Sequence, residues 1–172
     1  MNYEFGVFYI NKDGKQEITG ANQKHFPKAV GDGRRTLGEV VKDEYYYTDR
    51  WEVFLKNHDL SEVLKEGEVR KLSFVGSHTL GTGFTDGSDK VTKEVEEKLF
   101  EVFSKTPGFN FGRADIKAKT LEDFQSGNFK LIEVNGIASI PTHIFDPKYS
   151  VFKAFKVLFK YCLLYTSPSP RD

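Results

Sequence analysis

The chain has 172 residues, of which 38% are hydrophobic and 15% aromatic, enough to bury the core of one ordinary domain. Its 25 basic residues balance its 25 acidic ones, which argues against a nucleic-acid-binding surface spread over the whole chain. No apolar run approaches the length of a membrane span, and the first residues lack a signal-peptide pattern. We therefore expect a globular, cytoplasmic protein with neither nucleic acid nor a membrane as partner.

The first half of the chain predicts a strand, a hairpin turn and a short helix. YEFGVFYI (residues 3–10) is rich in aromatic and branched residues, and a hairpin-forming Asp-Gly pair follows it. GDGRRTLGEVV (31–41) predicts a turn and then a helix with Thr36 as its N-cap. We expect the next segments to form a helix over 49–57, a strand over 69–76 and a loop over 81–89.

The second half alternates helical and strand patterns. Apolar spacing predicts an amphipathic helix over 91–103, FGRADIK (111–117) reads as a strand, and Thr120 begins a short capped helix. LIEVN (131–135) reads as another strand. SVFKAFKVLFKY (150–161) has its polar positions on one stripe, so this helix is expected to be mostly buried. Without a repeat or a low-complexity linker, no domain boundary is expected inside the chain.

The last residues, Cys162–Asp172, read CLLYTSPSPRD. They resemble an in-frame translation of a sequencing-library adapter, so we predict that residues 162–172 are not native and that the native part spans 1–161. A natural polar C-terminus is the alternative. The chain has one cysteine and it lies in this tail, so residues 1–161 offer neither a disulfide nor a thiol for chemistry.

The LIEVN segment interrupts an apolar run with two polar residues. A period of two places Leu131, Glu133 and Asn135 on one face of the strand. A carboxylate beside a core is costly unless it has a charged partner, a metal or water. Antiparallel pairing with the preceding strand would bring Arg113 and Asp115 beside Glu133 and Asn135.

These oxygen donors suit a hard cation such as Mg²⁺, which is commonly held by one or two carboxylates together with phosphate oxygens and water. Arg113 on the same surface adds a planar donor for a phosphate or an acyl-phosphate. The pattern therefore predicts a metal-nucleotide site. The alternative is a solvent-facing pair of strands whose Arg and acidic residues form ion pairs.

GRADIK followed by KLIEVNGIASIPTHIFDP resembles the metal-binding part of ATP-grasp ligases, in which an Arg-x-Asp strand precedes a Glu-x-Asn strand. With the GDG-Thr segment, the region resembles D-alanine-D-alanine ligase-like and cyanophycin synthetase-like members. The resemblance spans residues 3–161. It implies an α+β ATP-grasp fold with a mostly antiparallel sheet and flanking helices. Residues 1–161 would be a partial domain without the N-terminal and upstream nucleotide-binding parts.

The resemblance also implies roles for individual residues. Asp115, Glu133 and Asn135 would hold Mg²⁺, for which Mn²⁺ can substitute, and Arg113 would contact the transferred phosphoryl group. Glu4 matches the acidic residue that accepts hydrogen bonds from the ATP ribose. An edge-strand Glu that resists aggregation is the alternative for this residue. Lys24 would contact a phosphate, and a solvated surface lysine is its alternative.

As a ligase, the parent protein would join a carboxylate to an amine through an acyl-phosphate, while the fragment alone would be inactive. The alternative is a non-catalytic nucleotide-binding or interaction module with the same fold. Ile140 stands where similar proteins have an acidic residue, which leaves substrate preference open. The loop residue His143 could serve the acceptor substrate but reads better as a packed histidine, and His78 receives no role.

Overall fold

The structure is a computed structural model that describes residues 3–43, 56–73, 76, 82–136 and 139–166. The chain divides into two compact units, one formed by residues 1–24 and 84–172 and the other by residues 25–83. No boundary is expected from the sequence, although the second crossing, between residues 83 and 84, lies in a segment with many Gly and Ser residues. No helix among the described residues is long and apolar enough to cross a membrane.

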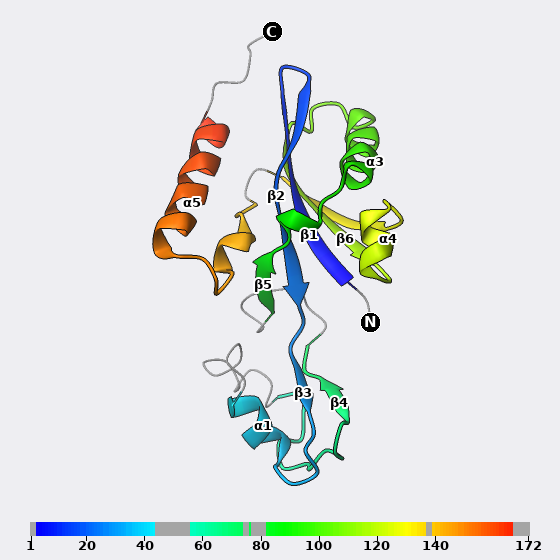
Figure 1. Cartoon of the computed structure of the whole chain (residues 1–172), viewed down its shortest axis with the longest axis vertical. Coiled ribbons are helices and arrows are strands. Elements are labelled where there is room, and N and C mark those ends of the chain that lie inside the picture. Colours follow the sequence, from blue (N-terminus) through cyan, green and yellow to red (C-terminus); the bar gives the residue numbers. More distant parts are fainter. Residues whose placement is uncertain (1–2, 44–55, 74–75, 77–81, 137–138, 167–172) are drawn as a thin grey trace. The chain divides into compact units, whose positions relative to one another are not determined.

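The larger unit is built on a five-stranded sheet in the order β5-β2-β1-β6-β7 (Figure 1). β1 pairs antiparallel with both β2 and β6, and β6 pairs antiparallel with β7. Positive φ angles of 54° at Asp13 and 80° at Gly14 form the expected hairpin turn between β1 and β2. The strands are β1 (Tyr3–Lys12), β2 (Lys15–His25), β5 (Gly83–Asp86), β6 (Phe111–Ala118) and β7 (Lys130–Asn135).

One face of this sheet carries the main core, covered by helices α3 (Lys93–Ser104) and α4 (Leu121–Gln125) (Figure 1). Both helices begin at a threonine whose side chain accepts a hydrogen bond from the backbone three residues later, Thr92 in α3 and Thr120 in α4. The second of these caps was predicted from the sequence and is confirmed. Buried members of the core include Phe5, Val7, Tyr9, Ala114, Ile116, Val95, Leu99, Phe103 and Phe124.

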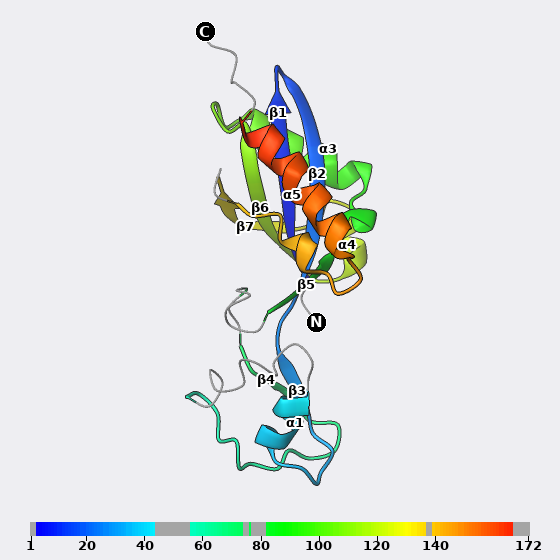
Figure 2. The same cartoon turned by 90° about the vertical axis from the view of Figure 1, so that its left-hand side faces the viewer.

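The opposite face carries the 3₁₀ segment η3 (Thr142–Phe145) and helix α5 (Val151–Thr166), as seen in Figure 2. Tyr161 anchors α5, because its side chain is buried edge-on against Phe8 and its hydroxyl lies 2.8 Å from Thr19 Oγ1. The prediction that this helix is mostly buried is wrong. Phe152 is 88% exposed, and Phe155 and Phe159 are each 66% exposed, because the helix turns its aromatic residues away from the sheet.

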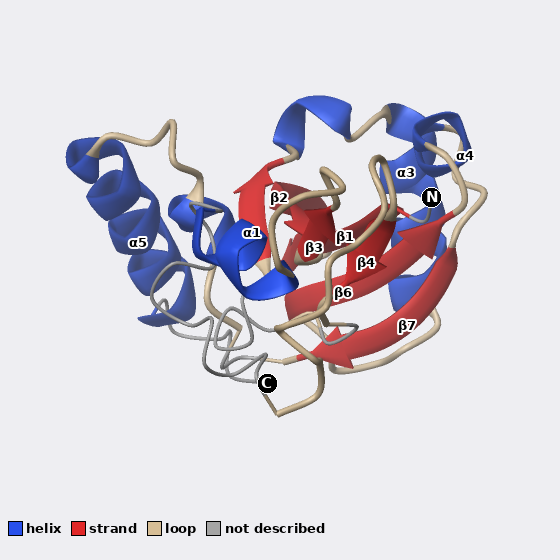
Figure 3. Cartoon of the chain, turned by 90° about the horizontal axis from the view of Figure 1, so that it is seen from below, coloured by secondary structure: helices blue, strands red, loops and turns tan. Residues whose placement is uncertain are grey.

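β7 differs from the expected simple alternation. The register changes between Asp115 and Ile116, so Asp115 pairs with Glu133 while Ile116 pairs with Leu131. The extra residue is Ile132, a β-bulge that places Leu131 on the opposite face from Glu133. The prediction that these two residues share a face is therefore wrong. The whole strand is also more exposed than expected (Figure 3 shows it at the edge of the sheet).

The segment expected to be a loop over 81–89 instead contains strand β5, followed by the short 3₁₀ segment η2 (Ser88–Lys90). The segment contains many turn-forming residues, yet it forms a strand because it pairs with the neighbouring β2 in the sheet. Strand formation here depends on a tertiary partner, which local propensity does not report.

The smaller unit pairs strand β3 (Lys28–Val30) antiparallel with β4 (Val69–Lys71) beside helix α1 (Leu37–Asp43). Thr36 caps α1 as expected, because its hydroxyl accepts from Glu39 N while the Glu39 carboxylate accepts from Thr36 N. The strand expected over 69–76 is shorter than predicted. Most of the expected helix over 49–57 lies outside the described residues. The buried core of the smaller unit consists of Ala29, Leu37, Val40, Val41, Leu64 and Leu72.

Candidate functional site

The polar residues singled out from the sequence meet on the sheet face opposite α3 and α4. Gly6 of β1 pairs with Asn22 on one side and with Asp115 on the other, and Asp115 pairs in turn with Glu133. In the next row along the strands, Arg113 pairs with Asn135. Paired residues of antiparallel strands point to the same side, so the predicted proximity of these residues is confirmed.

Asp115 is the centre of this surface. Its Oδ1 accepts a hydrogen bond from Arg113 Nε at 2.7 Å, and its Oδ2 accepts one from Arg113 Nη2 at 3.1 Å. Lys24 Nζ lies 3.0 Å from the same Oδ2, and the side chains of Lys24 and Asp115 are each only 6% exposed. Two cationic side chains therefore bind one buried carboxylate. Their charge-assisted hydrogen bonds offset part of the free-energy cost of removing these charges from water.

Glu4 lies in the row beyond Asp115, where its β1 position pairs with Lys24 on one side and with Lys117 on the other. Its carboxylate forms an ion pair with Lys117 Nζ at 2.9 Å, and its side chain is 13% exposed. Glu4 is therefore a largely buried acceptor beside the Asp115 group, rather than a solvated residue at a sheet edge.

Gly6 is the residue over which the site side chains converge. A Cβ at this position would lie 2.7 Å from Asn22 Nδ2, 2.8 Å from Arg113 Cδ and 3.1 Å from Asp115 Oδ1. Glycine is needed here to leave room for them. The sequence reasoning did not single out Gly6, and a glycine inside a strand pattern was the signal that could have found it.

Asn22 is a second residue that the sequence reasoning missed. Its side chain is fully buried, accepts a hydrogen bond from Gly6 N at 3.2 Å and donates one to Thr142 Oγ1 at 2.6 Å. It thereby ties the start of η3 to the sheet beside Asp115. Alternation from Lys24 places Asn22 on the same strand face, which was the available signal.

Glu133 and Asn135 supply further oxygen donors. Glu133 is exposed, so the expectation that its carboxylate lies beside a core is wrong. Because of the bulge and the edge position of β7, it stays in water. Asn135 has a buried Nδ2 without a hydrogen-bond partner, so the amide keeps an unused donor, while its Oδ1 is the atom that could bind a cation.

With Asp115, these side chains form a hard-oxygen set of two carboxylates and one amide on adjoining strands, which by its chemistry fits a divalent cation. No group of three or more His, Cys, Asp or Glu side chains in the described part of the chain is placed to bind a metal.

His143, expected to be a packed histidine, is indeed buried in η3. Its ring lies near the aromatic rings of Phe8, Tyr149 and Tyr161. Burial lowers the pKa of this imidazole, although the nearby Asp86 carboxylate partly opposes that effect. The histidine is therefore neutral near pH 7. His78 lies outside the described residues.

A second polar cluster joins β5 to the segment between η3 and α5. Tyr149 Oη donates to Asp86 Oδ2 at 2.6 Å, while Asp146 Oδ2 accepts from Asp86 N at 2.8 Å. Burial acts to raise the pKa of Asp86, but hydrogen bonds from Tyr149 and Ser88 outweigh it and lower the pKa. Every described polar group named here is paired within the fold, so this cluster reads as a structural link.

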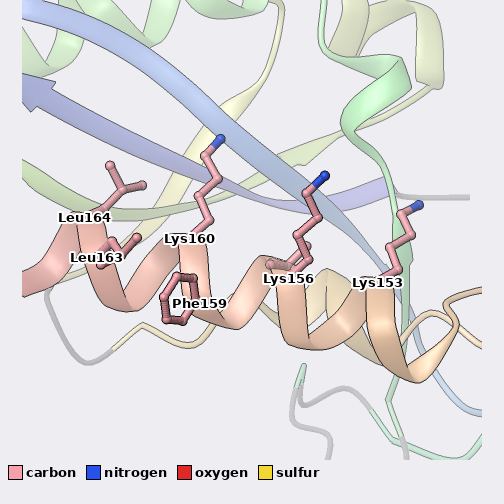
Figure 4. A pocket seen from close by; sticks show the side chains of 7 residues that line it. Lys153, Lys156, Phe159, Lys160, Leu163 and Leu164 are labelled. Carbon is pink, nitrogen blue, oxygen red and sulfur yellow. The ribbon is translucent and has the colours of Figure 1, made fainter.

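A groove runs along α5. Figure 4 shows Lys153, Lys156 and Lys160 along one side of the helix, with Phe159 on another. Lys153 lies over the Tyr149 ring, with 3.7 Å between its Nζ and the ring centroid. The groove contains none of the residues predicted for nucleotide or metal binding.

The larger unit, an antiparallel sheet with helices against its faces and an Arg-x-Asp strand paired to a Glu-x-Asn strand, has the ATP-grasp fold. A solved structure similar to this chain is the bifunctional glutathione synthetase from Pasteurella multocida, with a TM-score of 0.55 and 14% sequence identity. The match covers 92% of this chain and 23% of that chain. At this identity, the likeness shows the fold alone. No protein-family model matches the sequence, and no curated protein matches it.

Proposed function

We propose that this chain is part of an ATP- and Mg²⁺-dependent ligase that joins a carboxylate to an amine. The observation that supports this most directly is the register of Arg113 and Asp115 against Asn135 and Glu133 on one face of an ATP-grasp sheet. In this proposal the parent protein belongs with the D-alanine-D-alanine ligase-like and cyanophycin synthetase-like enzymes that the sequence resembles.

Asp115, Glu133 and Asn135 are the residues that would hold the cation. A bound Mg²⁺ neutralises the charge that builds on the phosphates during phosphoryl transfer. Glu133 is free to turn toward a ligand because it is exposed, whereas Asp115 is held in place by its ion pairs. One ligand is thus fixed by the fold and one can adjust.

Arg113 and Lys24 supply the positive charge for the phosphates. Arg113 carries its guanidinium next to Asp115 and is 17% exposed, which limits the water that competes for it. Its planar donors suit a phosphoryl group or an acyl-phosphate. Glu4 accepts hydrogen bonds from the ribose, and its present partner Lys117 is 41% exposed and can move aside.

The reaction proceeds in two transfers. A carboxylate oxygen of the first substrate attacks the γ-phosphorus of ATP, and ADP leaves. The amine of the second substrate then attacks the carbonyl of the acyl-phosphate, inorganic phosphate leaves, and the amine loses a proton. Neither step needs a side chain as covalent nucleophile, which agrees with a site composed of carboxylates, an amide and cations.

The test uses the longer parent protein that contains this chain. Glu133→Gln keeps the side-chain shape but removes one anionic ligand, so ATP turnover should fall by roughly 100-fold or more. The matched control is Glu97→Gln on the exposed side of α3, which should leave turnover unchanged. Turnover is measured as the release of inorganic phosphate from ATP in the presence of a panel of carboxylates and amines.

Two results would contradict the proposal. Near-normal turnover in Glu133→Gln would make Glu133 irrelevant to the cation. Nucleotide binding without turnover in the unaltered parent protein would instead favour the alternative, a non-catalytic nucleotide-binding module.

A further inference from the structure

The ion pair between Lys24 and Asp115 joins a proposed phosphate-binding residue directly to a proposed cation ligand. The atoms Lys24 Nζ and Asp115 Oδ2 lie 3.0 Å apart, and each side chain is 6% exposed. Asp115 Oδ1 is engaged by Arg113 Nε at 2.7 Å. Both carboxylate oxygens therefore already have a positively charged partner inside the fold.

A divalent cation that bound Asp115 would have to share this carboxylate with Lys24 or displace the lysine. Displacement leaves an ammonium group in a place with little access to water, which is costly unless another anion replaces Asp115. Sharing sets two like charges within a few ångströms of each other in a poorly screened region. Either way, the lysine works against a cation that arrives alone.

We propose that Lys24 is the resident counter-cation of Asp115 and antagonises the binding of a free divalent cation at this site. A cation that arrives with phosphate oxygens provides Lys24 with the anion it needs to release Asp115, so the site favours a metal-phosphate complex over the bare metal. This inference rests on the proposed function, since it takes Asp115 and Glu133 as the cation ligands. It adds that the lysine controls which form of the metal enters.

The neighbouring row provides a matched control. Lys117 lies on the same sheet face, but its carboxylate partner is Glu4, at 2.9 Å, and not Asp115. Lys117→Met removes the same unit of charge from the surface as Lys24→Met does. A difference between the two variants therefore reports the local competition for Asp115 and not the general electrostatic field.

The experiment measures Mn²⁺ alone binding to the 172-residue chain, followed by loss of the free-ion electron paramagnetic resonance signal. Lys24→Met should bind Mn²⁺ about tenfold or more tightly than the parent chain, since it removes a close and poorly screened positive charge. Lys117→Met should change the affinity by less than about twofold. Adding Glu133→Gln to Lys24→Met should abolish most of the gain.

Asp115 keeps both hydrogen bonds to Arg113 in Lys24→Met, so the variant is expected to fold, and circular dichroism verifies this. Lys24→Gln, which can still hydrogen-bond to Asp115 without a charge, gives the same test if Lys24→Met does not fold.

Each remaining outcome has a distinct meaning. Equal Mn²⁺ affinities in the Lys24 and Lys117 variants, with Glu133→Gln still weakening binding, would overturn the role of Lys24 and leave the cation site standing. Mn²⁺ binding that Glu133→Gln does not alter in any background would overturn the site itself, and with it the proposed function. Absence of binding by the folded Lys24 variants up to millimolar Mn²⁺ would also overturn the inference.

Discussion

Asp115 and Glu133 face each other across adjacent strands, yet their surroundings differ sharply. Asp115 is buried between Lys24 and Arg113, whereas Glu133 lies on the exposed edge strand. The two acids were assigned the same role from the sequence, and the proposal takes both as cation ligands. Their contributions to stability are not equivalent, because only Asp115 neutralises buried positive charge.

Replacing Asp115 by Asn should therefore lower the free energy of unfolding by about 3 kcal/mol or more, since it leaves Lys24 and Arg113 without their counter-charge. Glu133→Gln should change it by less than about 0.5 kcal/mol because the residue is exposed. Urea unfolding of both variants measures the difference. Equal losses in the two variants would mean that the Asp115 ion pairs do not support the fold.

His143 makes the free energy of unfolding depend on pH. Burial lowers the pKa of this imidazole from its ordinary value of 6.5. The unfolded chain therefore binds a proton below about pH 6.5 that the folded chain does not accept. Its contribution is present above that pH and is lost as the pH falls through 6.5 toward the lowered pKa of the folded state.

We expect the free energy of unfolding to decrease between pH 7.5 and pH 5.5, and to decrease less in His143→Phe, which fits among the aromatic rings of Phe8 and Tyr161. Asp86 also has a lowered pKa, from 3.8, so it stays ionised throughout this interval. Denaturant titrations at the two pH values supply the comparison. A parallel decrease in the variant would show that His143 is not the titrating group.

At the scale of elements, local signals predicted what local interactions determine. The caps at Thr36 and Thr120 and the Asp13-Gly14 turn follow from side chains that bond their own backbone or adopt positive φ, so short stretches of sequence suffice. β5 was missed because only its pairing in the sheet makes it a strand.

Helix α5 shows where periodicity alone fails. The lysine stripe was correctly recognised, but the pattern does not say which side of a helix meets the sheet. Lys153 Nζ and Lys160 Nζ each lie 4.0 Å from a carboxylate oxygen, in Asp86 and Glu17 respectively. The polar stripe thus lies toward the sheet strands, and the phenylalanines face away from them.

Tyr161 marks the end of the part of α5 that we expect to matter for stability. A chain ending at Tyr161 should melt within about two degrees of the full chain, because Cys162 and Leu163 are exposed. A chain ending at Lys160 should melt several degrees lower, because it loses the buried tyrosine and its bond to Thr19. Differential scanning calorimetry of the two truncated chains and the full chain measures the three melting temperatures. A large loss on the first truncation would mean that residues 162–172 belong to the fold.

At the scale of the whole molecule, the sequence predicted the fold class and the proximity of the site strands. It could not predict that Lys24 reaches Asp115, since that contact depends on the register of two strand pairs through β1. Nor could it predict the bulge at Ile132, because a bulge is a property of two paired strands and not of one.

The number of contacts proposed for the nucleotide limits the affinity of the isolated chain. Among the described residues we assign nucleotide contacts only to Glu4, Lys24 and Arg113, and all of them already have ion-pair partners. We expect the 172-residue chain to bind Mg-ATP weakly or not at all and to have no ligase activity. Isothermal titration calorimetry tests this. Submicromolar affinity, equivalent to more than about 8 kcal/mol, would show that further residues hold the nucleotide.

The outward-facing aromatic residues of α5 also affect how the protein behaves in concentrated solution. Phe152, Phe155 and Phe159 form an exposed apolar strip. The formal net charge of the chain is zero at pH 7, so there is little long-range electrostatic repulsion between molecules. Sulfate and other salts that are excluded from the protein surface increase the free-energy cost of exposing such an apolar strip to water. Purification near neutral pH in these salts therefore favours precipitation, whereas moving the pH away from neutrality gives every molecule the same sign of charge and keeps the protein dispersed.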